Sequence, residues 1–124
     1  MKWQGLLRFL VIGVGVLAFS ALAQAQEHKA WIEIEPDNSH LKIKAYCRNN
    51  ASEDCVLRYN LTVQKRGKSG RTSSAQSGSV YLPSQSEKCL SQLGLGVSLK
   101  DEYEIKLEVY KDGKLVAEDF VSYP

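Results

Sequence analysis

The chain is poor in the residues that enzymes and metal sites need. Its 124 residues include two histidines and three cysteines. We expect His28 and His40 to be solvated, and no Gly-x-Ser-x-Gly elbow or cysteine-protease signature places a base beside a nucleophile. The cysteines lack the Cys-x₂-Cys spacing of structural zinc sites and of thioredoxin-type redox sites. We therefore predict that the protein is not an enzyme and holds no metal or other cofactor.

Long apolar runs are also scarce, and the longest lies near the N-terminus. Residues 9–19 are apolar, follow two basic residues and precede the small-residue site Ala23-Gln24-Ala25. A membrane-spanning helix needs about 20 apolar residues, so an uncleaved membrane anchor fits this segment poorly. The pattern is typical of a secretory signal peptide that is cleaved after Ala25. We expect residues 1–25 to be a signal peptide and residues 26–124 to be one exported, periplasmic domain.

An excess of charge of one sign is absent from the exported part. The whole chain has a formal net charge of +2, with 16 basic and 14 acidic residues. Lys2 and Arg8 belong to the predicted signal peptide, which leaves 14 basic residues against 14 acidic ones. Nucleic-acid binding usually needs a strong positive field. We therefore expect no nucleic-acid partner, and no stable association with a membrane.

Helical periodicity is absent from residues 26–124, and short segments that alternate apolar with polar residues recur instead. Such alternation is typical of half-buried strands. The segments are separated by turn signals such as Pro36-Asp37-Asn38 and Asp112-Gly113. They cover residues 30–35, 41–47, 55–63, 71–82, 90–99, 103–109 and 115–123. The pattern predicts an all-β, seven-stranded immunoglobulin-like β-sandwich, with a small five- to seven-stranded barrel as the alternative.

Two of the cysteines bracket a polar loop. Cys47 ends one alternating segment and Cys55 begins the next. If the two segments form a hairpin, the register that brings these cysteines together also aligns their apolar faces. A disulfide stabilises a small exported domain by about 2–4 kcal/mol. We expect a Cys47–Cys55 disulfide, which leaves Cys89 free, partly buried or paired with something else.

The most unusual stretch runs from Tyr59 to Val80. An alternating segment leads into a basic turn spaced by glycines, Lys65 to Gly70, and then into residues 71–79. Alternation followed by such a turn predicts a hairpin. Its second arm consists mainly of small, hydroxyl and amide residues that have little to bury. We therefore predict an exposed polar strand that is a candidate binding edge.

Charged residues surround this predicted hairpin. On the expected hairpin between the cysteines, Lys42, Lys44 and Arg58 would lie close together, whereas the glutamates of residues 102–108 would form a separate acidic face. The candidate binding residues are Lys42, Lys44, Arg58, Lys65, Arg66, Lys68, Arg71 and Gln76. The alternative is that these charges are solvated and only prevent sheets from associating edge to edge.

Several residues carry a resemblance to a known family. They are Ile32–Glu35, Tyr59-x-Leu61-x-Val63-x-Lys65-x-Gly67, Gly70, Ser73, Gln76, Gly78, the strand Leu93–Leu99, Tyr103-x-Ile105-x-Leu107 and Asp112-Gly113. In these the chain resembles the curli amyloid-inhibitor family of periplasmic chaperones (the CsgC/CsgH type), most of all its CsgH branch. The Cys-x-Cys of one branch is absent, and Cys47, Cys55 and Cys89 do not sit where cysteines are expected in the other.

The resemblance implies both a fold and a function. The fold is a seven-stranded immunoglobulin-like domain in the periplasm. The function is to keep an amyloidogenic curli-type fibre subunit from polymerising before export, without ATP, by transient contact through an exposed strand and a basic sheet face. We expect the protein to be a monomer. The alternatives are a structural or adhesive accessory module of a surface fibre, and a redox protein that uses Cys89.

Overall fold

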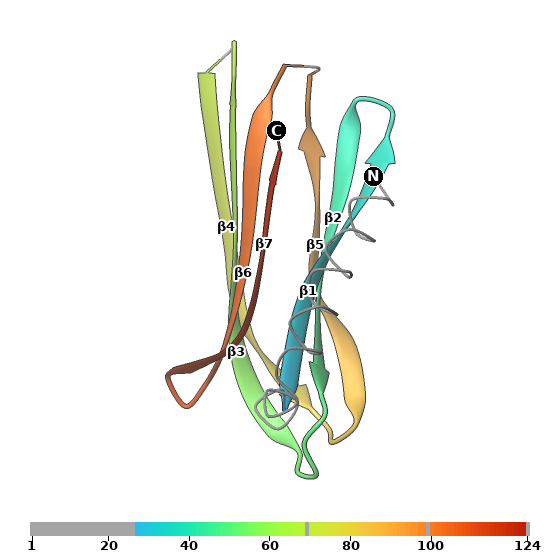
Figure 1. The fold of residues 1–124 in the computed structure, drawn as a ribbon, viewed down its shortest axis with the longest axis vertical. Coiled ribbons are helices and arrows are strands. Elements are labelled where there is room, and N and C mark those ends of the chain that lie inside the picture. The colour runs from blue at the N-terminus through green and yellow to red at the C-terminus, as the bar shows by residue number, and fades with distance from the viewer. Residues whose placement is uncertain (1–26, 69, 99, 124) are drawn as a thin grey trace, which may run out of the picture.

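The computed structural model describes residues 27–68, 70–98 and 100–123. These residues form seven strands in two antiparallel sheets (Figure 1). The strands are β1 (His28–Asp37), β2 (His40–Asn49), β3 (Cys55–Gly67), β4 (Gly70–Leu82), β5 (Ser86–Gly96), β6 (Glu102–Lys111) and β7 (Lys114–Tyr123). One sheet has the order β1-β2-β5 and the other β4-β3-β6-β7. The predicted seven-stranded all-β sandwich is confirmed, whereas the predicted signal peptide lies outside the described residues.

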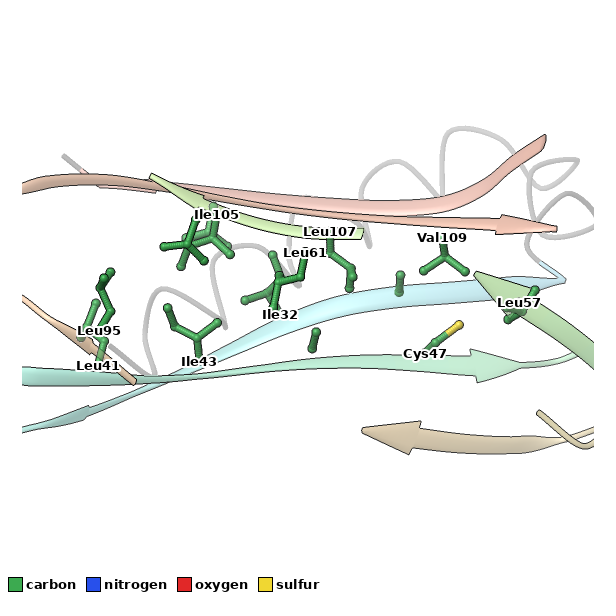
Figure 2. Close-up of a cluster of buried hydrophobic side chains, with 14 of the residues drawn as sticks. Ile32, Leu41, Ile43, Cys47, Leu57, Leu61, Leu95, Ile105, Leu107 and Val109 are labelled. Atoms are coloured by element: carbon green, nitrogen blue, oxygen red, sulfur yellow. The ribbon is translucent and has the colours of Figure 1, made fainter. Parts of the chain in front are cut away.

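The core lies between the two sheets and follows from the alternation along each strand. In β6, Ile105, Leu107 and Val109 are fully buried while their neighbours of opposite parity face solvent. Figure 2 shows these three side chains facing Ile43 and Cys47 of β2 across the space between the sheets. Burying one such aliphatic side chain stabilises the fold by about 1.5–3 kcal/mol. The alternation therefore both selects the strands and assigns their inner faces.

The expected hairpin between the segments that end at Cys47 and begin at Cys55 is wrong. The strand β2 pairs with β1 and β5, whereas β3 pairs with β4 and β6. The intervening residues therefore cross from one sheet to the other. Alternation shows which face of a strand is buried but not which strand lies beside it, so an in-sheet and a cross-sheet neighbour give the same pattern.

The crossing loop between β2 and β3 is organised by the buried side chain of Asn49. Its Nδ2 donates to the carbonyl oxygens of Glu53, at 2.8 Å, and Leu82, at 3.0 Å. Its Oδ1 accepts the N–H of Ala51 at 2.9 Å. The fully buried amide is thus satisfied by backbone groups, as buried polar groups generally must be. This arrangement ties the loop to the end of β4.

Cys47 and Cys55 are buried free thiols in the structure, and Cys89 is an exposed one. Burial, reinforced by the Cys55 thiol, raises the pKa of Cys47 to about 12. The Sγ atom of Cys55 lies 3.6 Å from Nε2 of His28. Contrary to expectation His28 is buried, and this burial lowers its pKa, while His40 is exposed as expected. The Cys47–Cys55 disulfide stays a prediction; it would join the two sheets, not two arms of a hairpin.

The β3–β4 hairpin is held near its tip by Asp101 from the β5–β6 loop. The Asp101 carboxylate accepts the N–H of Ser98 at 2.8 Å and lies 3.8 Å from Nζ of Lys65. A Cβ on Gly67 would overlap Oδ1 of Asp101, so any larger residue here would force this carboxylate to move. Lys65 also donates to the carbonyl oxygen of Gly96 at 2.8 Å. These contacts fix the hairpin relative to the end of β5.

We expect Gly67→Ala to lower the stability of the protein by about 1–3 kcal/mol, because it displaces a buried carboxylate from its hydrogen bond. The matched control is Gly94→Ala in β5, where an added Cβ meets no atom within 4 Å. That change should be neutral or stabilise by about 0.5–1 kcal/mol, since glycine is unfavourable within a strand. Urea unfolding of both variants is the measurement. Equal midpoints would contradict the role of Asp101.

Thiol labelling distinguishes the three cysteines. In native protein at pH 8 we expect the exposed Cys89 to react and Cys47 to stay unmodified, because its burial and raised pKa keep the thiolate unpopulated. Labelling in denaturant without reductant then reports the oxidation state. Three reactive thiols would contradict the predicted Cys47–Cys55 disulfide, and one would confirm it. Reduced, denatured protein supplies the total as a control.

Candidate functional site

The strand β4 is an edge strand and carries little of the core. All six residues from Gly70 to Ala75 are exposed, and only Leu82 at its far end is buried. Its pairing with β3 runs from Gly67–Gly70 at the tip to Cys55–Leu82 without a register shift. The predicted hairpin with an exposed polar second arm is therefore confirmed. The tip of this hairpin stands apart from the β1–β2 turn in Figure 1.

The two sides of the sandwich are closed to different degrees. On one side β1 contacts β7, and the N–H of Ile32 donates to Oδ2 of Asp119 at 2.8 Å. On the other side the edges of β4 and β5 are linked by side chains: Ser91 donates to Gln76, and Nζ of Lys88 donates to the carbonyl oxygen of Tyr81 at 2.9 Å. These contacts involve the second half of β4. The first half extends past them toward the hairpin tip.

Part of the candidate set does gather on this hairpin. Arg58 and Arg66 of β3 are exposed and lie opposite Ser79 and Arg71 of β4, respectively. The exposed Lys68 is in the connecting turn. Like charges that face each other across a strand pair are unfavourable. Arg66 is also 3.5 Å from Glu102 of the neighbouring β6, which offsets this repulsion.

The expected cluster of Lys42, Lys44 and Arg58 is wrong. The two lysines lie on β2, in the three-stranded sheet, and Arg58 lies on β3, in the four-stranded sheet, so they occupy opposite outer faces of the sandwich. Lys44 forms a 3.2 Å ion pair with Glu35, whose hydrogen bond raises the pKa of Lys44. Although β2 and β3 are consecutive in the sequence, they belong to different sheets.

The expected separation into a basic and an acidic face is also wrong. The strand β6 pairs with β3, so its outward glutamates share one face with Arg58 and Arg66. Lys65 and Gln76 point inward, where Lys65 contacts Gly96 at the end of β5 and Asp101 of the β5–β6 loop, and Gln76 contacts Ser91 of β5. These two side chains hold the hairpin in place and are not presented on its surface.

Two shallow hollows lie on the outer face of the four-stranded sheet near the hairpin tip. The larger, of about 250 Å³, is lined by Gln64, Lys65, Arg66, Arg71, Thr72, Ser73 and Glu104. The smaller, of about 140 Å³, lies on the β6–β7 side of Arg66. Guanidinium, amide and hydroxyl donors in the larger hollow suit carboxylate or amide side chains of a partner. Neither hollow places a nucleophile against a base.

One surface feature was missed from the sequence. Val56 and Tyr81 are opposite each other in the β3–β4 register and are 60% and 53% exposed. Tyr81 Oη donates to Asp54 at 2.6 Å, and this hydrogen bond lowers the pKa of the Asp54 carboxyl. The sequence signal that could have indicated this patch is Val56, an apolar residue at a position that the alternation of β3 assigns to the outer face. The result is a small apolar patch at the end of β4 away from the hairpin tip.

The described ranges 27–68, 70–98 and 100–123 contain no group of three or more His, Cys, Asp or Glu side chains arranged to hold a metal ion. Within these same ranges, no helix is long and apolar enough to cross a membrane.

Comparisons with known proteins point to curli biogenesis. The family model for the thin aggregative fimbriae synthesis protein, Tafi-CsgC, matches residues 22–119. The structure is similar to that of the E. coli curli protein CsgC, with a TM-score of 0.65 and 18% identity over 75% of this chain and 96% of that one. It is also similar to R. palustris CsgH, with a TM-score of 0.58 and 17% identity over 73% of this chain and 89% of that one. No curated protein matches the sequence.

Larger proteins share the fold alone. A Bacteroides uniformis β-glucuronidase matches with a TM-score of 0.57 and 12% identity, over 77% of this chain but 14% of the enzyme. Such a match shows a shared β-sandwich domain and carries no activity with it. The family model, in contrast, spans most of the chain. The protein therefore belongs to the Tafi-CsgC family of curli-associated proteins, which is extracytoplasmic in general and is not a family of enzymes.

Proposed function

We propose that the protein is a periplasmic, ATP-independent chaperone that keeps a secreted curli-type fibre subunit from polymerising prematurely. The exposed polar strand β4 carries the proposal, together with membership of the Tafi-CsgC family. Amyloid fibres grow by adding strands to exposed edges, often through ladders of polar side chains. A domain with an exposed strand of similar polar side chains can bind such a subunit before the subunit binds another fibre subunit. A cleaved signal peptide over residues 1–25 would deliver the domain to the periplasm.

The cations at the hairpin tip would make this contact selective and transient. Arg66, Lys68 and Arg71 bring three cations together at the hairpin tip, and Glu102 of β6 pairs with Arg66. Complementary charge accelerates encounter and orients partners more than it adds to affinity. The same charges keep an exposed strand from acting as a template for edge-to-edge association. We propose Arg58, on the same face, as a further contact, and Lys65 and Gln76 as positioning residues.

Part of this proposal is that the protein is a monomeric immunoglobulin-like domain, and the strand order supports the immunoglobulin-like arrangement. In such domains the strands A, B and E share one sheet, and C, F and G share the other. The observed sheets, β1-β2-β5 and β4-β3-β6-β7, follow this grouping with β4 as an extra strand beside β3. The extra strand, which adds little to the core, is the one proposed to meet the partner.

Fibrillation of a purified curli subunit, followed by dye fluorescence, tests the proposal. We expect substoichiometric protein to lengthen the lag phase. The triple variant Arg58→Glu, Arg66→Glu, Arg71→Glu should need about tenfold more protein for the same delay, since each exposed charge contributes about 0.2–1 kcal/mol. The matched control is Lys42→Glu, Lys44→Glu on the opposite face, which should act like the unmodified protein.

An unchanged lag and growth rate with unmodified protein would contradict the chaperone. Stable, stoichiometric co-purification with assembled fibres would instead support an accessory module of the fibre. Loss of activity in the Lys42, Lys44 variant alone would place the contact on the three-stranded sheet.

A further inference from the structure

The register of the β3–β4 hairpin determines which backbone groups of β4 point away from the protein. Gly67 pairs with Gly70 across a two-residue turn, and the pairing continues without a shift to Cys55–Leu82. The pair next to such a turn exchanges both of its N–H···O bonds, and bonded and non-bonded pairs then alternate along the ladder. The even-numbered residues of β4 therefore bond to β3. The odd-numbered residues direct their N–H and C=O outward; they are Arg71, Ser73, Ala75, Ser77, Ser79 and Tyr81.

Two observed hydrogen bonds agree with this alternation. In the β1–β2 hairpin, which also has a two-residue turn, the Asp37–His40 pair implies that the N–H of Ile32 points outward. That N–H donates to Asp119 of β7. In β4, the outward carbonyl of Tyr81 accepts Nζ of Lys88. In both β1 and β4, the backbone groups that point outward are therefore those that the two-residue turn predicts.

The outward backbone groups from Arg71 to Ser79 differ from those of Ile32 and Tyr81, which are hydrogen-bonded to side chains. In the part of the chain that the structure describes, no side chain hydrogen-bonds to the outward backbone groups of residues 71, 73, 75, 77 and 79. Edge strands are usually protected by proline, inward-pointing charges or a β-bulge. Residues 72–79 contain no proline and no charge, and the β3–β4 pairing has no bulge. A nine-residue edge of about 30 Å is therefore open to pairing.

The side chains along this edge leave room for a partner strand and indicate its chemistry. Ser73, Ala75, Ser77 and Ser79 are small and exposed on the outer face. Hydroxyl groups in a strand pair favour hydroxyl or amide side chains opposite them. Arg71, opposite Arg66, begins the edge and favours a carboxylate. The edge thus suits an extended segment rich in Ser, Thr, Asn or Gln with an acidic residue near one end.

A second copy of this chain suits the edge less well. If two copies paired antiparallel about a twofold axis at Ala75, Arg71 of each copy would lie opposite Ser79 of the other. Ser79 is the neighbour of Arg58 across the β3–β4 ladder, so arginines would approach each other at both ends of the pairing. Charges of the same sign repel across this separation of two strands, which disfavours the pairing.

We infer that β4 binds its partner by strand addition: an extended polar segment of the fibre subunit pairs with the outward backbone groups of residues 71–79. This inference rests on the proposed function and specifies its binding mode. The polar arm itself forms the interface, and the cations at the tip orient the incoming segment.

Proline at an outward position tests this binding mode. We choose Ser77→Pro, because its N–H is not used in the ladder to β3 and proline is tolerated at such edge positions. The matched control, Ser77→Ala, removes the hydroxyl but keeps the N–H. In the fibrillation assay with a purified curli subunit, Ser77→Pro should need about tenfold more protein than Ser77→Ala for the same delay, since it loses a backbone hydrogen bond and blocks its neighbour.

Amide hydrogen exchange on the unmodified protein gives an independent measurement that requires no variant to fold. When monomeric curli subunit is added, we expect the amides of Ser73, Ala75, Ser77 and Ser79 to exchange at least about tenfold more slowly. The even-numbered amides between them, already bonded to β3, should change little. Alternating protection that depends on the subunit would support strand addition.

Three outcomes would overturn the inference. If the unmodified protein delays fibrillation but shows no alternating protection, and Ser77→Pro acts like Ser77→Ala, strand addition is wrong while the proposed function stands. If the unmodified protein causes no delay, the proposed function fails and this binding mode fails with it. If the same amides become protected without subunit as protein concentration rises, the edge pairs with a second copy.

Discussion

The burial of β3 is the constraint on which the rest of the structure depends. Leu57, Leu61 and Val63 are almost completely removed from solvent and pack between the two sheets. With β6 on one side of it, β3 is anchored by the core and does not need the side chains of β4. Each buried aliphatic residue contributes about 1.5–3 kcal/mol, against a net of about 1 kcal/mol for a ladder hydrogen bond. The fold therefore tolerates a polar strand at this edge.

The attachment of β4 to this buried strand is mainly through the backbone. Leu82 is the one fully buried side chain of β4. At Gly78 the backbone of β4 packs closely against Tyr59 of β3, because an added Cβ would lie 3.0 Å from Oη of Tyr59. The inward side chains of Lys65 and Gln76 hold the hairpin against the other sheet: Lys65 contacts Gly96 and Asp101, and Gln76 contacts Ser91 of β5. This combination gives a strand that is held in place but little covered, which is what an interaction edge requires.

The two ends of the β3–β4 hairpin carry different chemistry. At the tip, Arg66 and Arg71 face each other, and the carboxylates of β6 share their face. At the opposite end, Cys55 begins β3 and lies beside His28 in the core. The buried thiols are thus separated from the cations at the tip by the length of β3. A change in their oxidation state would act on the closure of the two sheets and not directly on the cations at the tip.

The sequence by itself determined what is local. Short extended segments between turn signals predicted seven strands, and alternation with a period of two predicted the buried faces of β1, β2, β3 and β6. Glycine-containing turns predicted the β3–β4 and β6–β7 hairpins, because each of these features depends on neighbouring residues alone. The exposed polar arm of β4 followed from its composition. Only the tertiary structure decided that β2 and β3 belong to different sheets, which places Lys42 and Lys44 on the outer face away from Arg58. It also decided that the side chains of Lys65, Gln76 and His28 point inward. These features depend on which strands pack together, and the period of two is the same whichever neighbour a strand has.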